Sequence, residues 1–458
     1  MSKKRSVKNP IYQQDDLSDI KLICEEGALA IFAVKQPSDQ GDAKRMVRVL
    51  RNIRNHFALK REKDLLHYLN RFPKDFPTFY EIRKSGFSYL KIFDFAGKHN
   101  LQTVVKAEGP LSTKAAKKCL KHLVSALDKV HGVGFVHTRI RPENILVNKD
   151  HYYLADWTGA MPALPSYETE LLMGDQKYCP PERLNGEYQA AGDVYLLGCV
   201  LYFALTGKHI YRLNKVEHYF DQLYAHAFHT PRKLNTLPLV WRQLIMWMTQ
   251  KDPQNRPSLA ELQQWLKEPS VPKSIRQQSV ETVKDFPEDS LTVLADSHYL
   301  YAQFKKATLL EASGEREIAF NLYETCAFRG YTRAENNLGL LYQKGQVVQK
   351  SYIKAMNMYY QAYEKGNPYG AYNLGYMFEK GQGVTVNLKR ARKLYEYAAM
   401  RGHLAAQNRL GECYQQGKGV EKDVAKARFW FGMAAHYGHD LASENIHQLL
   451  AESRKRAV

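Results

Sequence analysis

The sequence predicts a multidomain protein in which an α+β domain at residues 19–268 precedes an all-α repeat domain at residues 294–458. An ordered series of short motifs indicates the first domain, and a repeat of 36 residues indicates the second. Residues 1–18 form a basic N-terminal segment. Residues 269–293 begin with Pro269 and Pro272 and continue as a polar run, which is typical of a linker.

The motifs of the first domain occur in a fixed order along the chain. They are Ala33-Val34-Lys35, a helical pattern that contains Glu62, His137-Thr138-Arg139 with Asn144 five residues later, Leu154-Ala155-Asp156, Tyr178-Cys179-Pro180-Pro181-Glu182, Asp193 at the start of an apolar helix, and Arg256. In this order and spacing the segment from Asp19 to Glu268 resembles the protein kinase superfamily. The resemblance implies a bilobal protein-kinase-like fold, in which His137, Glu182, Asp193 and Arg256 have structural roles.

The catalytic loop departs from the family at its central residue. Where protein kinases carry the aspartate that accepts the proton of the substrate hydroxyl, this chain carries Arg139. A guanidinium stays protonated and has no acceptor atom, so it cannot act as this base. Loss of general-base catalysis costs about 3–5 kcal/mol of barrier. The sequence therefore offers no confident catalytic residue.

The resemblance implies ATP and Mg²⁺ as cofactors. It places Lys35 on the third strand, paired with Glu62 on the following helix, and it gives Asp156 and Asn144 as ligands of Mg²⁺. Lys106 and Glu108 are further candidates for nucleotide contact. The alternative interpretation is that the lysine–glutamate pair and the asparagine persist as a structural polar network.

The expected phosphate loop argues against nucleotide binding. A loop that cradles phosphates needs glycines, yet no glycine precedes Gly27. With Lys35 on the third strand, the loop falls at residues 13–18, where Asp15 and Asp16 repel a polyanion. We therefore expect ATP binding to be weak or absent, and to depend on Mg²⁺ if it occurs.

Two groups of arginines are candidates for contact with an anion or a partner. Arg139 and Arg141 lie in the catalytic loop. Arg45, Arg48 and Arg51 belong to a basic segment, residues 44–63, in which apolar residues at helical spacing predict an amphipathic helix. This segment would meet an acidic protein, an anionic membrane or nucleic acid; the alternative is a solvated face.

The second domain is defined by an internal repeat. Leu338-Gly339, Leu374-Gly375 and Leu410-Gly411 are spaced by 36 residues, and an aromatic residue follows each glycine after three positions. Small residues at fixed places let two helices approach closely, and the aromatics fill the layer between neighbouring repeats. The pattern resembles the Sel-one-like repeat, a relative of the tetratricopeptide repeat. It implies an α-helical solenoid with a divergent first repeat and a C-terminal capping helix, whose use is to bind protein partners. A brace against the first domain remains the alternative.

Composition fits an intracellular protein. The six cysteines are dispersed, without the spacing of a disulfide framework or a zinc site, and no apolar stretch is long enough to span a membrane. A cytoplasmic location is the default, and delivery by a specialised bacterial secretion system is compatible with the sequence. The net charge of +19 is spread over both domains.

Together these features predict a signalling pseudokinase that acts as a scaffold or adaptor and binds partners through residues 294–458. The alternative is an atypical protein kinase or nucleotidyl-transferring enzyme that uses ATP and Mg²⁺ with a different base. Phosphoryl transfer is mostly positioning and charge stabilisation, so loss of the base alone does not exclude it.

Overall fold

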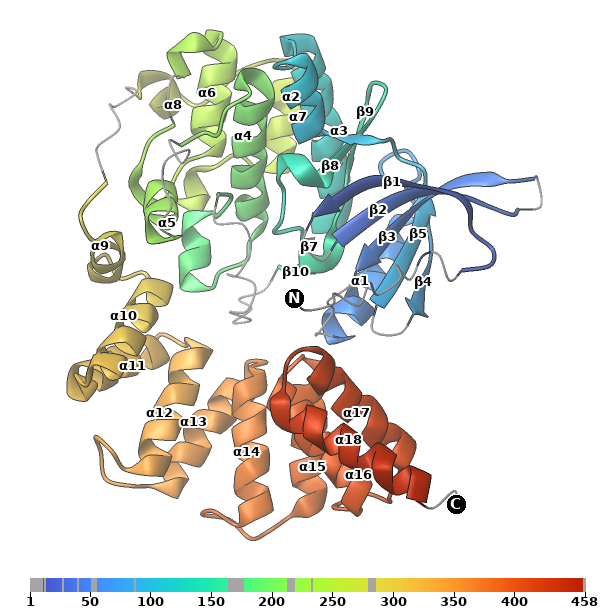
Figure 1. Cartoon of the computed structure of the whole chain (residues 1–458). Helices are drawn as coiled ribbons and strands as arrows, with labels where there is room; N and C mark the ends of the chain where they lie inside the picture. The colour runs from blue at the N-terminus through green and yellow to red at the C-terminus, as the bar shows by residue number, and fades with distance from the viewer. Residues whose placement is uncertain are drawn as a thin grey trace, which may run out of the picture.

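The computed structural model describes residues 11, 14–26, 29–38, 41–50, 56–85, 88–163, 177–211, 219–231, 234–278 and 286–455. Figure 1 shows a bilobal first domain above an arc of helices, with the strands of the N-lobe on the right and the helices of the C-lobe at the upper left. The predicted fold class, a kinase-like domain followed by a helical solenoid, is confirmed.

The N-lobe is an antiparallel sheet with the strand order β1-β2-β3-β5-β4. Its elements are β1 (Ser18–Glu26), β2 (Leu29–Gln36), β3 (Ala43–Leu50), α1 (His56–Leu69), β4 (Phe79–Ser85) and β5 (Ser88–Asp94). α1 buries Leu65, Leu66 and Leu69. This face of α1 packs against the core of the first domain.

The amphipathic helix predicted for residues 44–63 is wrong over its first part. Ala43–Leu50 is a strand that pairs with β2 on one side and with β5 on the other. Met46, Val47, Arg48 and Val49 are all buried, because the strand lies inside the sheet and is covered on both faces. The helical spacing of Met46 and Val49 is therefore incidental. Arg51 and Arg54 lie outside the described residues.

The C-lobe is mainly helical and surrounds the apolar helix α4 (Ala190–Thr206), in which thirteen residues are buried. The other helices are α2 (Leu101–Glu108), α3 (Thr113–His131), α5 (Tyr219–Phe228), α6 (Leu239–Met248) and α7 (Leu259–Lys267), and the short strands are β6 (His99–Asn100), β7 (Phe135–Val136), β8 (Ile145–Asn148), β9 (His151–Leu154) and β10 (Met161–Pro162). β8 and β9 form a hairpin that begins directly after the catalytic loop.

The predicted linker is packed on the C-lobe in its first part. Val271 and Ile275 are buried in the core of the first domain, and Ile275 belongs to the short helix α8 (Lys273–Gln277). Residues 279–285 lie outside the described part of the chain. The next helix, α9 (Ser290–Asp296), starts inside the predicted linker.

The second domain is a series of antiparallel helix pairs followed by a single helix. The pairs are α10 (Leu300–Ser313) with α11 (Arg316–Phe328), α12 (Thr332–Lys344) with α13 (Tyr352–Glu364), α14 (Pro368–Lys380) with α15 (Leu388–Met400), and α16 (Leu404–Gln416) with α17 (Val424–His436); α18 (Asp440–Lys455) follows. The first pair occupies the position of the predicted divergent repeat, and α18 that of the predicted cap.

The repeated glycines let the two helices approach closely in the three pairs from α12 to α17, as the sequence predicted. A Cβ atom on Gly339 would lie 2.5 Å from the ring of Tyr359, and one on Gly411 would lie 2.6 Å from the ring of Phe431. Gly375 has the same relation to Tyr395, at 2.8 Å. The aromatic ring thus occupies the space that any larger residue would need.

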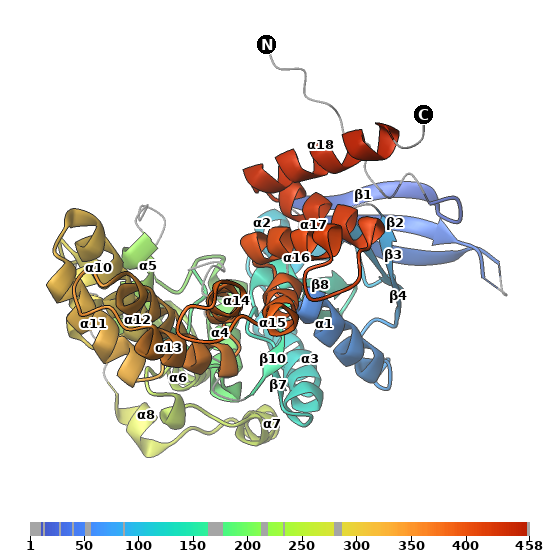
Figure 2. The ribbon, with the colours of Figure 1, turned by 90° about the horizontal axis from the view of Figure 1, so that it is seen from below.

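Seen from below, the helical array lies across both lobes of the first domain (Figure 2), and it contacts each of them. At its N-terminal end, Leu294 and Leu300 share an apolar cluster with Leu184 and Leu223 of the C-lobe. At its C-terminal end, the ring of Phe429 on α17 lies 4.3 Å from the ammonium group of Lys84, which is on β4 of the N-lobe. The array therefore bridges the two lobes.

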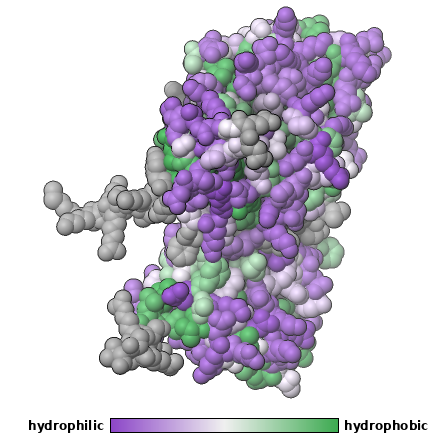
Figure 3. All heavy atoms as spheres, turned by 90° about the vertical axis from the view of Figure 1, so that its right-hand side faces the viewer, coloured by the Kyte–Doolittle hydropathy of each residue, from purple (hydrophilic) through white to green (hydrophobic). Residues whose placement is uncertain are grey.

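The side of the molecule formed by the N-lobe and the C-terminal helices is mostly hydrophilic, with hydrophobic residues in smaller groups (Figure 3). Within the described ranges, every helix is either too short or too polar to cross a bilayer.

Candidate functional site

The catalytic loop keeps its supporting hydrogen bonds. The buried carboxylate of Asp193, on α4, accepts from the backbone N–H groups of His137, at 2.7 Å, and Thr138, at 2.8 Å. It also contacts the ring of His131 at 2.9 Å. These bonds stabilise Thr138 in the left-handed region, with φ of 66°. The loop is thus held in place, with Arg139 at the position where the resemblance to kinases expects the aspartate.

His137 and Asn144 connect this loop to the chain around Asp156. The His137 ring lies 3.1 Å from the carbonyl oxygen of Ala155, and burial lowers the pKa of His137 to about 4. Asn144 donates from its side-chain amide to the carbonyl oxygen of Arg139 at 2.8 Å. Because His137 is neutral at physiological pH, it serves as a packing and hydrogen-bonding residue.

The carboxylate of Asp156 lies between two guanidinium groups. Arg48 Nη2 is 3.4 Å from Asp156 Oδ1, and Arg139 Nη1 is 3.4 Å from Asp156 Oδ2. The side chains of Arg48 and Asp156 are each only 6% exposed. Arg139, which replaces the catalytic base, thus contacts the residue expected to hold the metal ion.

Thr158 completes this group of residues. Its hydroxyl donates to Asp156 Oδ1 at 2.6 Å and accepts from Arg139 Nη1 at 2.8 Å. A residue without a hydroxyl at this position would supply neither bond. We call Arg48, Arg139, Asp156 and Thr158 the Asp156 cluster.

The charges of the cluster stabilise the ionised carboxylate. Burial alone would raise the pKa of Asp156, but the positive charges of Arg139 and Arg48 and the hydrogen bond from Thr158 hold that pKa well below its usual range. Asp156 is therefore a carboxylate over the whole physiological pH range, with its charge already balanced.

The predicted role of Lys35 is wrong. Lys35 is on β2, the second strand, where its side chain is exposed. The third strand is β3, and its buried cation is Arg48. The short match at Ala33-Val34-Lys35 led to this error. In addition, β3, the strand directly before the helix of Glu62, was predicted to be part of a helix. Arg48 was named only as a surface contact, and its burial contradicts that role.

The predicted ion pair between Lys35 and Glu62 is also wrong. Glu62, on α1, pairs with the ammonium group of Lys91 on β5, and both side chains are buried. Burial lowers the pKa of Lys91, and the carboxylate of Glu62 opposes this shift. The polar network that the sequence left as an alternative is therefore present, with Lys91 in place of Lys35. Lys91 was missed because it lies in the middle of an apolar strand.

The predicted phosphate loop at residues 13–18 does not join the first two strands. β1 begins at Ser18, and the turn between β1 and β2 falls at residues 27–28, outside the described residues, as does Gln13. The carboxylate of Asp16 instead binds the guanidinium of Arg83, with atoms 2.5 and 2.7 Å apart. The negative charge of Asp16 is therefore paired, contrary to the prediction that it repels a phosphate.

The Asp156 cluster does not fit Mg²⁺. A magnesium ion needs oxygen ligands with free lone pairs and few cations nearby. Here two guanidinium groups contact the one carboxylate, and a divalent cation would be repelled by both. No set of three histidine, cysteine or acidic side chains in the described part of the chain is arranged to hold a metal ion.

The end of the activation segment keeps its structural ion pair. Arg256 binds both carboxylate oxygens of Glu182 at 2.7 and 2.8 Å, and the two side chains are 0% and 5% exposed. Arg256 also donates to the carbonyl oxygens of Ala191, Gln250 and Lys251. This pair fixes the start of α4 against the loop that precedes α7.

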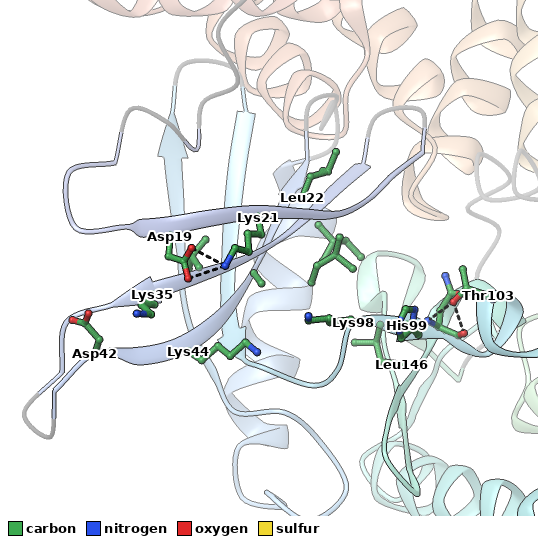
Figure 4. Close-up of a pocket in the computed structure, with 15 residues that line it drawn as sticks. Asp19, Lys21, Leu22, Lys35, Asp42, Lys44, Lys98, His99, Thr103 and Leu146 are labelled. Carbon is green, nitrogen blue, oxygen red and sulfur yellow. Dashed lines mark hydrogen bonds and ion pairs between the residues drawn. The ribbon is translucent and has the colours of Figure 1, made fainter. Parts of the chain in front are cut away.

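A separate cavity of about 600 Å³ lies where the N-lobe sheet meets the start of α2 (Figure 4). Lys21, Lys35, Lys44 and Lys98 line it, together with apolar residues that include Ile31 and Leu146. Lys35 and Lys44 are directly opposite each other on β2 and β3. Of the residues predicted to bind nucleotide, Lys35 lines this cavity, whereas Glu62, Asn144 and Asp156 do not.

Comparison with known proteins agrees with this architecture. A family model of the protein kinase domain matches residues 17–268, and a model of the Sel1 repeat matches residues 332–367, 368–403 and 404–439. The chain belongs to the protein kinase family. The kinase domain is thus followed by three recognised Sel1 repeats, with the helix pair α10–α11 before them and α18 after them.

The kinase domain has many curated relatives. It is 38% identical over 119 residues to the serine/threonine-protein kinase PknH of Mycobacterium bovis, covering 25% of this chain and 20% of that protein. It is 37% identical over 141 residues to PknD of Mycobacterium tuberculosis, covering 30% and 21%. Sperm motility kinase 2B of Mus musculus is 29% identical over 174 residues, covering 37% and 35%. The matches span about a fifth to a third of these relatives.

Among solved structures, the Cydia pomonella granulovirus kinase PK-1 matches with a TM-score of 0.47 and 20% identity. The match covers 55% of this chain and 94% of that one.

The remaining predicted contact residues are dispersed over the kinase domain. Lys106 and Glu108 are exposed at the C-terminal end of α2 and do not line the lysine-rich cavity. Arg45 binds Asp94 at 2.7 Å and stacks on the ring of Tyr80. Arg141 is partly buried directly before the short helix of Pro142–Asn144. Of the described arginines in the basic segment, Arg45 and Arg48 thus pair with carboxylates of the kinase domain itself.

Proposed function

We propose that this chain is a catalytically inactive member of the kinase family, which acts as a scaffold. The observation that carries the proposal is the position of Arg48 and Arg139 on either side of Asp156. Arg139 removes the general base, and together the two arginines take the place of the metal ion. The fold is kept by Asp193, Glu182 and Arg256, whose roles do not involve a substrate.

The helical array supports the scaffold role in two ways. Sel1 repeats are of the protein-interaction type, and the array leaves large apolar side chains exposed, among them Phe328, at 95%, and Ile353, at 66%. Its contacts with both lobes support the brace as well. The two roles are compatible, because the ends of the array hold the kinase domain while the faces between them remain accessible.

The purified chain is expected to transfer no phosphate to itself or to generic protein substrates above the level of an Asp156→Asn variant. The reason is that the base is missing and the metal-binding carboxylate is neutralised. Arg139→Asp alone is expected not to restore transfer, since Arg48 still contacts Asp156. Intact-mass spectrometry after incubation with Mg²⁺ and ATP measures this. A phosphate or nucleotide adduct on the unmodified chain would instead favour the enzymatic alternative.

A further inference from the structure

A second cavity, of about 840 Å³, lies where the two lobes and the repeat array meet. Its walls come from α1 of the N-lobe, from residues 133 and 135 directly before the catalytic loop, and from α15 of the array. We call it the junction cavity. Its volume is within the range of about 300–1,000 Å³ that is typical of ligand sites. Neither the kinase domain nor the array forms it alone.

The interior of the junction cavity is apolar. Leu65 and Tyr68 contribute from α1, and Tyr397 and Met400 from α15. Val133, at 38%, and Met400, at 37%, are two of the large apolar side chains that the protein leaves exposed. Exposed apolar side chains collected in one concavity are typical of an interaction site.

Cationic side chains also line the junction cavity. Lys60, Arg61, Lys393 and Arg401 line the cavity, against the carboxylates of Asp64 and Glu396. Glu396 is already bound by Arg392, which does not line the cavity, at 2.7 Å. The guanidinium of Arg401 stacks on the ring of Tyr397, 3.6 Å from its centre. Burial and the nearby Lys84 lower the pKa of His56, so this lining residue adds no charge at neutral pH. The lining of the cavity therefore combines apolar side chains with more cationic than acidic groups.

From this geometry we infer that the junction cavity receives an acidic peptide segment of a protein partner, with large apolar side chains inserted between α1 and α15. Leucine or phenylalanine side chains match the interior, and glutamate or aspartate residues beside them match the lysines and arginines. The inference deepens the proposed scaffold function and rests on it. It places the partner at a site built from both domains. The affinity for the partner would therefore depend on the position of α1 relative to the array.

Fluorescence anisotropy with a labelled peptide, Glu-Glu-Leu-Phe-Glu-Glu-Leu-Leu, tests the inference on the full chain. Lys393 and Lys389 are both exposed on α15, one helical turn apart, and only Lys393 lines the cavity. Lys393→Glu is expected to weaken binding about five- to tenfold, and Lys389→Glu to leave it within about twofold. Met400→Asp is expected to weaken it further. Equal thermal unfolding of the variants shows that each is folded.

Three results would overturn the inference. These are no binding of the peptide, an equal loss in the Lys393 and Lys389 variants, and equal binding of a peptide in which serine replaces the apolar residues. A fourth result would also overturn it. If anionic vesicles displaced the labelled peptide and the unlabelled peptide did not, the surface would be assigned to membrane binding. None of these results bears on phosphate transfer, so a failure here is distinguishable from a failure of the inactive-kinase proposal.

Discussion

Replacing Arg256 by alanine is expected to destabilise the kinase domain by about 3–5 kcal/mol, because it leaves the carboxylate of Glu182 buried without a counter-charge. The two side chains are 0% and 5% exposed and share two hydrogen bonds. Three backbone carbonyl groups lose a donor in the same change. Urea unfolding followed by tryptophan fluorescence measures the loss.

The control for this variant is Arg242→Ala. Arg242 is on α6 of the same lobe and donates one exposed hydrogen bond, to Asn235 at 3.0 Å. Its loss is expected to cost no more than about 0.5 kcal/mol. Similar losses in the two variants would show that the ion pair of Glu182 and Arg256 does not hold the C-lobe together.

Replacing Asp156 by alanine is expected to destabilise the fold by a similar amount, about 3–5 kcal/mol, because Arg48 and Arg139 would face each other without an anion. If Asp156 were retained only to bind a metal ion, its replacement by alanine would instead stabilise the fold, since it would remove an unpaired buried charge. Asp64→Ala, which removes an exposed carboxylate from α1, is the control and is expected to be near neutral. Thermal unfolding compares the two.

The same residue gives a pH dependence. The pKa of Asp156 is lowered in the folded state, so its contribution to stability is complete above the unfolded pKa of about 3.9 and is lost as the pH falls toward the folded value. Below about pH 4 the wild-type chain is expected to lose stability more steeply than an Asp156→Asn variant. If the stability of the wild-type chain and that of the Asp156→Asn variant fell in parallel between pH 5 and pH 2.5, the assignment of Asp156 as an ionised, paired carboxylate would be contradicted.

The features that the sequence predicted well are those in which residues of a given type stand at fixed distances along the chain. Asp193, Glu182 and Arg256 occupy the structural positions expected of them, because each is part of a motif with several matching neighbours. The repeats were equally clear, since each glycine has to meet one aromatic ring, as Gly411 meets Phe431. Such contacts restrict both the type of residue and its spacing, so the sequence of one chain is enough to predict them.

The N-lobe of the candidate site was predicted poorly for a physical reason. A buried central strand shows no alternation of polar and apolar residues, so β3 was mistaken for a helix and Arg48 for a surface residue. The useful signal was the distance along the chain to Glu62, because the cation belongs to the strand directly before that helix. The pairing of Glu62 with Lys91 could not be predicted, since it depends on how α1 packs against β5. The junction cavity depends likewise on how the two domains pack.

In the function proposed here, two arginines occupy the place of the metal ion at Asp156. Isothermal titration calorimetry with ATP, in the presence of Mg²⁺ and in its absence with a chelator, tests it most directly. The structure predicts that Mg²⁺ does not tighten ATP binding, and that any residual affinity is unchanged in the Asp156→Asn variant. ATP binding that requires Mg²⁺ and is abolished by Asp156→Asn would contradict this proposal. Such binding would show that the carboxylate of Asp156 leaves Arg48 and Arg139 to bind the metal ion.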